Sequence, residues 1–119
     1  MIPAQGRDDG KKKGGGMQKF YKEKNSFVYI LSNRPNGTIY VGVTDNLCKR
    51  VWQHKNDIAD GFTKKYQIHD LVYYEEFGEI SLAFFREKQL KKWRRKWKND
   101  LIEKENANWD DLYNAVCLS

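Results

Sequence analysis

Two short apolar runs joined by a turn constrain the fold of this chain more than any other feature. Residues 27–32 and 38–43 are rich in β-branched and aromatic side chains, which is typical of strands. The Asn36-Gly37 pair between them tolerates positive φ angles and favours a tight turn. We therefore expect the folded part of the chain to begin with an antiparallel hairpin.

Each strand of this hairpin contains a tyrosine, and a glycine follows the second one closely. Side chains alternate between the faces of a strand, so closure on a two- or four-residue loop puts Tyr29, Tyr40 and Gly42 on one face. A glycine inside a strand often marks a place where another group approaches the backbone. Taken alone, two tyrosines on one face are more often half-buried packing residues, because tyrosine is a good strand former. The opposite face should belong to the core and consists of Val28, Ile30, Ile39, Val41 and Val43.

A helix should follow the hairpin. Apolar side chains recur at helical spacing from Leu47 to Ile58. Thr44 or Asp45 would supply the N-cap of this helix, because both side chains can accept a hydrogen bond from the first turn. Gly61 should mark its end.

The rest of the chain predicts one further strand and more helices. Residues 70–77 predict a third strand, residues 80–104 a long basic helix or a pair of helices, and residues 108–116 a short closing helix. The order β-β-α-β-α-α predicts an α/β (α+β) fold, in which helices flank a small three-stranded antiparallel sheet. The apolar side of the long helix should consist of Leu82, Phe85, Leu90, Trp93 and Trp97.

The charge of the chain favours a polyanionic partner. Lysine and arginine total 22 against 16 acidic residues, which gives a net charge of +6 and a pI near 9.3. A small basic domain is drawn to nucleic acid or to an anionic membrane surface, although solubility alone would also explain the charge. No apolar run approaches the length of about 18 residues that spans a membrane.

The length and the cysteine content of the chain indicate its number of domains and its redox environment. A chain of 119 residues forms one domain by default, and we expect residues 26–119 to form it behind a disordered leader at residues 1–25. Cys48 and Cys117 lie far apart and match no metal-binding spacing. We therefore expect no zinc site, no disulfide and a reducing cytoplasmic environment.

Three residues on the expected helices add chemistry to the two tyrosines. Arg50 and His54 lie one turn apart beside the stripe that should face the sheet, where the planar fork of an arginine suits a phosphate. Glu87 could hold a divalent metal ion. Two of them also have an ordinary alternative: His54 as a satisfied boundary histidine, and Glu87 in an ion pair with Lys91. In a basic protein, the five residues together are a workable set for hydrolysing a phosphodiester.

The two tyrosine motifs resemble the signature of a known family. Phe27-Val28-Tyr29, ten intervening residues and Tyr40-Val41-Gly42 resemble the two-part signature of the GIY-YIG endonucleases. The segments TDNLCKRVWQHK (44–55) and AFFREKQLKKWRRKWK (83–98) are also similar to that family. They are most similar to its small stand-alone bacterial members, relatives of the N-terminal catalytic domain of the excinuclease C subunit. Phe27 replaces the first motif's glycine, which should narrow access to the tyrosine face.

The resemblance implies a GIY-YIG fold and a metal-dependent endonuclease that acts on DNA, in repair or recombination, with a single Mg²⁺ or Mn²⁺ ion. By position, Tyr29 resembles the family's proposed general base, Tyr40 its supporting tyrosine and Arg50 its phosphate-stabilising arginine. Glu87 resembles the single metal ligand, and His54 matches a position often held by histidine or tyrosine. Further expected substrate contacts are Gly42, Thr44, Lys55, Lys91, Arg94, Arg95, Lys98 and Asn99.

Two other interpretations of the chain compete with the enzyme. One is a non-catalytic nucleic-acid-binding module that retains the fold, and the other is an interaction protein that uses Trp93 and Trp97. The presence of both Arg50 and Glu87 favours the enzyme, because a charged residue near a core boundary is costly to keep without a ligand. We expect DNA as the partner, structured or branched DNA included, with no membrane association and with the chain as a monomer.

Overall fold

The computed structural model describes residues 25–59 and 61–118. These residues form a three-stranded antiparallel sheet of β1 (Ser26–Ser32), β2 (Ile39–Thr44) and β3 (Asp70–Phe77), in the order β2-β1-β3. The predicted sheet is confirmed. The predicted disordered leader lies, apart from its last residue, outside the described residues.

The hairpin of β1 and β2 has the register that side-chain alternation predicts. Tyr29 pairs with Gly42 and Leu31 pairs with Tyr40, so the two tyrosines lie diagonally on one face of the hairpin. The turn uses a left-handed backbone at Asn36, with φ of 59°. We call the side of the sheet that bears both tyrosines the tyrosine face.

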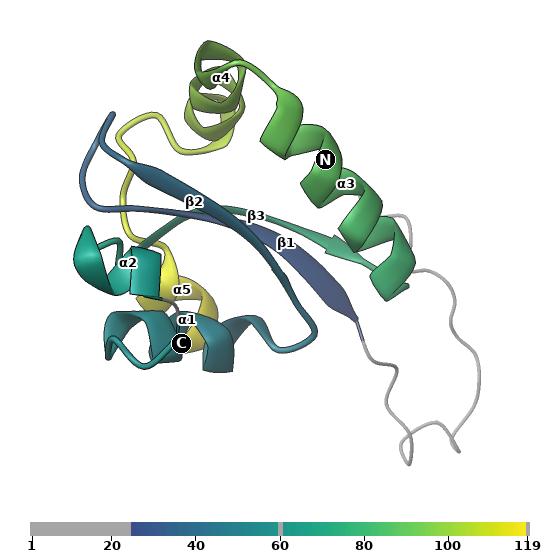
Figure 1. Cartoon of the computed structure of the whole chain (residues 1–119), viewed down its shortest axis with the longest axis horizontal. Coiled ribbons are helices and arrows are strands. Elements are labelled where there is room, and N and C mark those ends of the chain that lie inside the picture. Colours follow the sequence, from purple (N-terminus) through teal and green to yellow (C-terminus); the bar gives the residue numbers. More distant parts are fainter. Residues whose placement is uncertain (1–24, 60, 119) are drawn as a thin grey trace.

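Helices cover both faces of the sheet (Figure 1). The helices α1 (Leu47–Lys55), α2 (Gly61–Lys65) and α5 (Tyr113–Cys117) lie on the tyrosine face, and α3 (Ile80–Lys92) and α4 (Arg95–Glu105) lie on the other. The predicted order of elements is confirmed, with the long basic helix divided into α3 and α4 and with the short α2 added. No helix within the described residues is both long and apolar enough to cross a membrane.

The sheet separates two apolar clusters, and each is built from the hairpin face that alternation assigns to it. On the side of α3 and α4 the buried residues are Val28, Ile30, Val41, Val72, Tyr73, Ala83, Leu90, Ile102 and Trp109, with Ile39 and Val43 packed against them. On the tyrosine face they are Tyr29, Leu31, Leu47, Val51, Ile68 and Leu71.

The start of α1 differs from the prediction. Asn46 is the N-cap, and its side-chain oxygen accepts a hydrogen bond from the Lys49 N–H at 3.2 Å. Thr44 instead shapes the turn before the helix, because its hydroxyl accepts the Asn46 N–H at 3.0 Å. The prediction that Thr44 or Asp45 caps the helix is therefore wrong by one or two positions.

The end of α1 also differs from the prediction. The helix ends at Lys55, and Asp57 takes a left-handed φ of 58°, which breaks the helical spacing. Ile58 is consequently exposed, whereas the spacing had placed it on the buried stripe. Gly61 begins α2 and does not end α1.

The side of α3 that faces the sheet is narrower than its apolar pattern suggests. Ala83 and Leu90 are buried, whereas Leu82 and Phe85 are exposed. The small side chain of Ala83 lets the helix pack closely on the sheet, which turns the larger residues on either side outward. The prediction for Leu90 is confirmed, and those for Leu82 and Phe85 are wrong.

The two tryptophans occupy different environments. Trp93 lies between α3 and α4 and packs against the core, as predicted, whereas Trp97 is about half exposed. Their rings meet edge to face, with centroids 6.0 Å apart. The guanidinium groups of Arg86 and Arg94 lie 5.1 and 5.2 Å from the centroids of Trp93 and Trp97, respectively.

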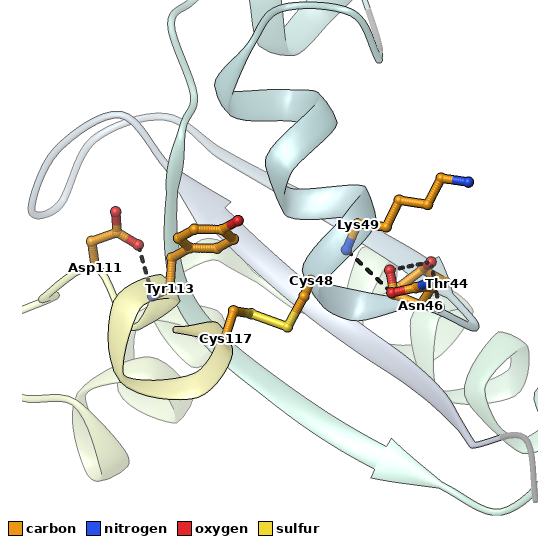
Figure 2. Close-up of a disulfide and its surroundings, with 7 residues drawn as sticks. All are labelled: Thr44, Asn46, Cys48, Lys49, Asp111, Tyr113 and Cys117. Atoms are coloured by element: carbon orange, nitrogen blue, oxygen red, sulfur yellow. Dashed lines mark hydrogen bonds between the residues drawn. A yellow bond between two sulfur atoms is a disulfide. The ribbon is translucent and has the colours of Figure 1, made fainter. Parts of the chain in front are cut away.

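Cys48 and Cys117 form a disulfide, with Cα atoms 5.7 Å apart (Figure 2). The bond joins α1 to α5 across a sequence separation of 69 residues. The prediction of no disulfide is wrong, because the chain brings α5 back against α1 and no sequence spacing reveals that contact. The cytoplasmic interpretation of unpaired cysteines loses its basis with this bond.

Candidate active site

The tyrosine face holds a hydrogen-bonded triplet of side chains, Tyr29, His54 and Thr63. The Tyr29 hydroxyl lies 3.0 Å from His54 Nε2, and His54 Nδ1 lies 2.9 Å from the Thr63 hydroxyl. The three residues come from β1, α1 and α2, and all three are buried. In the tautomer with its hydrogen on Nδ1, His54 donates to Thr63, and its Nε2 accepts a hydrogen bond from the phenol. His54 is thus a satisfied histidine, as in the ordinary alternative, but it lies in the interior and not at the boundary.

Gly42 makes room for the Tyr29 phenol. A β carbon at position 42 would lie 2.5 Å from the Tyr29 hydroxyl oxygen and 2.6 Å from the ring carbon that bears it. No side chain fits at these distances, so the ring occupies the space that Gly42 leaves. Because β2 is an edge strand of the described sheet, the phenol reaches from the central strand towards that edge.

Tyr40 lies beside the triplet and keeps part of its surface in solvent. Its ring centroid is 6.3 Å from that of Tyr29 and 5.2 Å from that of His54. Tyr29 itself is only 1% exposed. The structure therefore brings Tyr29, Tyr40 and His54 together, with Tyr40 towards solvent.

Arg50 lies on α1 one turn before His54 and is half-buried. One of its guanidinium nitrogens donates a hydrogen bond to the Gln53 side chain at 3.1 Å. A half-buried guanidinium keeps its charge and its fixed donor geometry, which are the properties that phosphate binding requires. Its contact with a phosphate stays a prediction.

Glu87 lies on α3, in the other layer of the molecule. Its side chain is 16% exposed, and its carboxylate forms an ion pair with Lys91 Nζ at 2.6 Å. The ion pair that the sequence offered as the ordinary role of Glu87 is therefore present in the structure. The helix packs against both β1 and β2. Tyr29 therefore lies on one face of the sheet and the helix that bears Glu87 packs on the other, and the meeting of the two residues in one site stays a prediction.

Three cations gather where α3 passes into α4. Burial lowers the pKa of Lys98, and the nearby charges of Arg95 and Lys91 lower it further. Arg95 also donates to the Gly37 carbonyl in the hairpin turn and to the Asn99 side chain, the latter at 2.7 Å. The contact of Arg95 with Gly37 places the cation cluster of Lys91, Arg95 and Lys98 beside the turn that leads into β2, and Lys91 of this cluster is also the partner of Glu87 in its ion pair.

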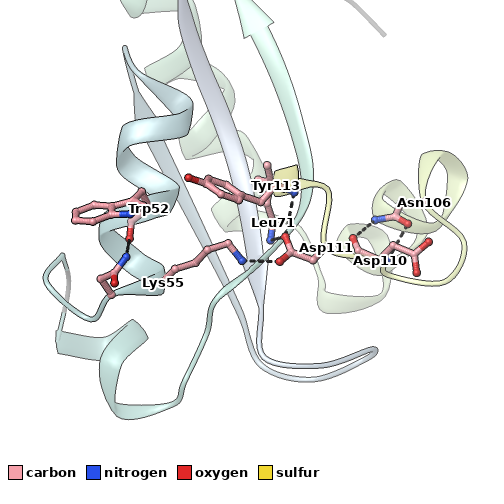
Figure 3. Close-up of polar contacts among 8 residues, drawn as sticks. Trp52, Lys55, Leu71, Asn106, Asp110, Asp111 and Tyr113 are labelled. Atoms are coloured by element: carbon pink, nitrogen blue, oxygen red, sulfur yellow. Dashed lines mark hydrogen bonds and ion pairs between the residues drawn. The ribbon is translucent and has the colours of Figure 1, made fainter. Parts of the chain in front are cut away.

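Lys55, which we expected to contact DNA, also has a structural role. Its ammonium lies 2.5 Å from Asp111 Oδ2 and 5.1 Å from the centroid of the Tyr113 ring (Figure 3). The other oxygen of Asp111 accepts the N–H groups of Leu71 at 3.0 Å and of Tyr113 at 3.1 Å. Lys55 therefore helps to hold α5 against α1 and β3, and its contact with DNA stays a prediction.

The donor set of the molecule fits a metal ion held by one carboxylate. Among the described residues, no three His, Cys, Asp or Glu side chains lie close enough to share a metal. Mg²⁺ commonly binds through one or two carboxylates and keeps several of its waters. Glu87 can serve such a site, because the mostly exposed Lys91 can turn away from the shielded carboxylate when a cation takes its place.

Several residues of this region were not singled out from the sequence. Thr63 bonds to His54 from a separate helix, and no spacing rule connects the two positions. Gln53 bonds to Arg50 within α1, and a search for pairs three residues apart would have found it. Phe62 and Tyr66, four residues apart beside this site, could have been noticed as an aromatic pair on one helical face.

Comparisons with known proteins identify a family and several related proteins. A family model described as the GIY-YIG catalytic domain matches residues 25–100. A UPF0213 protein of Clostridium perfringens is 35% identical over 78% of this chain and 99% of its own length. A UPF0213 protein of Bacillus pumilus is 30% identical over 68% of this chain and 83% of its own. The solution NMR structure of a UPF0213 protein from Bacillus halodurans covers 76% of this chain and 95% of that one, with 23% identity and a TM-score of 0.47.

Proposed function

Because this chain belongs to the GIY-YIG catalytic-domain family, we propose that it is a metal-dependent endonuclease that hydrolyses phosphodiester bonds in DNA. The observation that supports this proposal best is the contact of the Tyr29 hydroxyl with His54 Nε2 at 3.0 Å. A phenol is a poor base while it keeps its proton, and a neighbouring imidazole nitrogen can take that proton. The ring nitrogens of a buried histidine need partners in any case, and what supports the proposal is that one of these partners is the phenol of the first tyrosine motif.

The triplet can supply a general base. Transfer of the phenol proton to His54 Nε2 leaves a phenolate on Tyr29, which then accepts a proton from the attacking water. The imidazolium that forms donates its Nδ1 hydrogen to the Thr63 hydroxyl at 2.9 Å, which stabilises the positive charge. Tyr40, on the solvent side of Tyr29, would orient the water or the phosphate.

The charged residues can bind the phosphate on which the water acts. Arg50 would donate two parallel hydrogen bonds to non-bridging oxygens of the scissile phosphate. A Mg²⁺ or Mn²⁺ ion at Glu87 would neutralise charge on the same phosphate and stabilise the leaving oxygen. The cation cluster of Lys91, Arg95 and Lys98, with Arg94 and Asn99, would bind phosphates that flank it.

The proposed activity suits the repair or recombination of structured or branched DNA by a monomeric protein. A cytoplasmic location now rests on the DNA substrate alone, because the paired cysteines no longer support it. The competing proposal, a binding module without activity, gains some support from the ion pair that neutralises Glu87 and from the burial of Tyr29.

A cleavage assay decides between the enzyme and the binding module. The parent protein and Glu87→Gln would be incubated with branched, nicked, duplex and single-stranded DNA, each with Mg²⁺, with Mn²⁺ or with EDTA. We expect the parent to cut at least one substrate only when a metal is present, and Glu87→Gln to bind that substrate without cutting it. A parent protein that binds DNA but cuts no member of the panel would identify the binding module.

A further inference from the structure

A row of three aromatic rings leads from the candidate active site onto the molecular surface. The Tyr40 and Phe62 ring centroids are 6.4 Å apart, and those of Phe62 and Tyr66 are 4.9 Å apart. Tyr40 is half-buried beside His54, whereas Phe62 and Tyr66 are 45% and 42% exposed. We call these three residues the aromatic row. Large apolar side chains that stay in contact with one another and with water at the mouth of a site suggest a ligand.

The helix α2 fixes the aromatic row to the triplet. Thr63 points inward from α2 and bonds to His54, while Phe62 is exposed on the same helix. Tyr66 follows the last residue of α2, and its N–H donates to the Phe62 carbonyl at 3.1 Å. The Tyr66 carbonyl accepts a hydrogen bond from the Asn33 side chain at 3.2 Å, which ties this end of the row to the hairpin turn. The exposed rings are therefore held in place relative to the candidate catalytic residues.

Two lysines lie next to the aromatic row. The Lys65 ammonium lies 5.4 Å from the centroid of the Tyr66 ring, and the neighbouring Lys64 is exposed. The first turn of α2 contains no acidic residue. Exposed aromatic rings with lysines beside them match the chemistry of a strand whose bases stack on the rings and whose phosphates meet the cations.

We propose that the aromatic row binds unpaired bases of a DNA strand, so that the enzyme acts on single-stranded DNA or on the unpaired strand beside a duplex. The cleavage of the bound strand rests on the proposed function, whereas the binding of unpaired bases by the row does not. In a duplex, both faces of each base are covered by its neighbours, and cations alone suffice to bind the phosphates. Rings offered at a site of DNA cleavage therefore favour a substrate whose base faces are uncovered.

Binding measurements in EDTA test the aromatic row without any cleavage. A fluorescently labelled thymidine oligonucleotide and a duplex of the same length would be titrated with the parent protein, with Phe62→Leu and with Tyr66→Leu. Leucine keeps the apolar surface and removes the aromatic face. We expect each variant to bind the single strand about 5- to 100-fold more weakly, since a stacked base contributes about 1–3 kcal/mol. Duplex binding should not change.

Matched variants separate stacking from folding. Phe84→Leu is the control, because Phe84 is 50% exposed but lies on α3, in the other layer of the molecule, and its loss should alter neither titration. Phe62→Trp and Tyr66→Phe keep an aromatic face and should bind the single strand as the parent does. If the leucine variants bind the single strand as tightly as the parent, or lose single-strand and duplex binding equally, the row is not a base-stacking site.

The inference and the proposed function fail in different ways. If the row variants lose single-strand binding as expected but the parent cuts no DNA with any metal, the stacking site stands and the endonuclease does not. If the parent cuts duplex DNA and the row variants bind and cut all substrates as the parent does, the endonuclease stands and the stacking site does not.

Discussion

Tyr29 and Tyr40 share one face of the hairpin but differ in their access to solvent. Tyr29 is buried against His54, and Tyr40 lies outside it. In the proposed function, Tyr29 transfers the proton and Tyr40 orients the substrate. The roles of the two phenols can be distinguished by removing one hydroxyl at a time, because the ring of each variant still packs.

The first prediction compares these two hydroxyls. Tyr29→Phe should slow single-turnover cleavage by about 10²- to 10⁴-fold, the usual contribution of a general base, without weakening DNA binding. Tyr40→Phe should slow it less. Thermal unfolding of both variants checks that the fold is intact. A larger loss from Tyr40→Phe than from Tyr29→Phe would exchange the two roles.

The second prediction concerns the space that Gly42 leaves for Tyr29. Gly42→Ala places a methyl group 2.5 Å from the Tyr29 hydroxyl oxygen, and the buried ring has little room to withdraw. We expect a loss of about 1–3 kcal/mol in the free energy of unfolding, as is usual for overpacking. Denaturant titration measures it. Gly78→Ala is the control, because a β carbon there meets nothing within 4 Å. Equal stability of the two variants would contradict this account of Gly42.

The positions of individual site residues could be predicted from the sequence only where the periodicity of one strand or helix determines them. The two-residue period of a strand is enough to place Tyr29, Tyr40 and Gly42 on one face, and the register of the hairpin agrees with it. The contact of His54 with Thr63 depends on how α2 packs after an irregular link, which no periodicity describes.

Among the elements, α1 and α5 are joined by a disulfide that closes a loop across a sequence separation of 69 residues. The third prediction is that replacing both Cys48 and Cys117 by serine lowers the free energy of unfolding by about 2–4 kcal/mol, because the unfolded chain regains the freedom of a long loop. Denaturant titration of this variant and of the parent, each with and without reducing agent, measures the effect. Reducing agent should destabilise the parent and leave the variant unchanged. If the parent and the variant have the same stability without reducing agent, the bond does not form in solution.

Where α3 passes into α4, the buried charge of Lys98 lowers the stability of the fold, and the proposed function uses the same charge to bind DNA. Because the pKa of Lys98 is lowered by burial and by the charges of Arg95 and Lys91, the charged form is less favourable in the folded state than in the unfolded one. Its charge therefore opposes folding at neutral pH. This opposition disappears as pH rises from the folded pKa through the unfolded value of 10.5.

The fourth prediction follows from this sign. Lys98→Met should raise the free energy of unfolding at neutral pH and lose that advantage as the lysine of the parent titrates at alkaline pH. It should also weaken DNA binding and reduce the slope of log affinity against log salt by about 0.7 to 0.9, as expected when one phosphate contact is lost. Lys96→Met is the stability control, because Lys96 is exposed and its ion pair with Asp100, at 3.2 Å, is on the surface. A Lys98→Met protein that binds DNA as the parent does would remove Lys98 from the interface.

The helices and strands could be predicted where the residues of the element itself indicate it. The strands and the existence of α1 and α3 follow from composition and spacing, but α2 has only five residues and no strong periodic signal. The buried side of α3 was misassigned because close packing at Ala83 outweighs the larger apolar residues around it. Packing against the sheet therefore determines which side of α3 is buried, and the spacing of its apolar residues does not.

For the molecule as a whole, the sheet order places the proposed site at an edge. The central strand β1 supplies Tyr29, whose phenol extends over β2, while α3 packs against β2 from the other face and bears Glu87. The central claim is that these two residues serve one reaction across the edge strand. The sequence suggested this through family resemblance, but no pattern along the chain relates a residue on the hairpin to one on α3.

A double-mutant cycle on cleavage tests this claim most directly, as the fifth prediction. Single-turnover rates would be measured for the parent, Tyr29→Phe, Glu87→Ala and the double variant, with exposed Glu105→Ala as the control. Residues that act as a unit in one site are strongly non-additive, so we expect the double variant to be about as slow as the slower single variant. Rates that multiply, or a Glu87→Ala protein that cuts DNA as fast as the parent with Mg²⁺ and with Mn²⁺, would contradict a shared site.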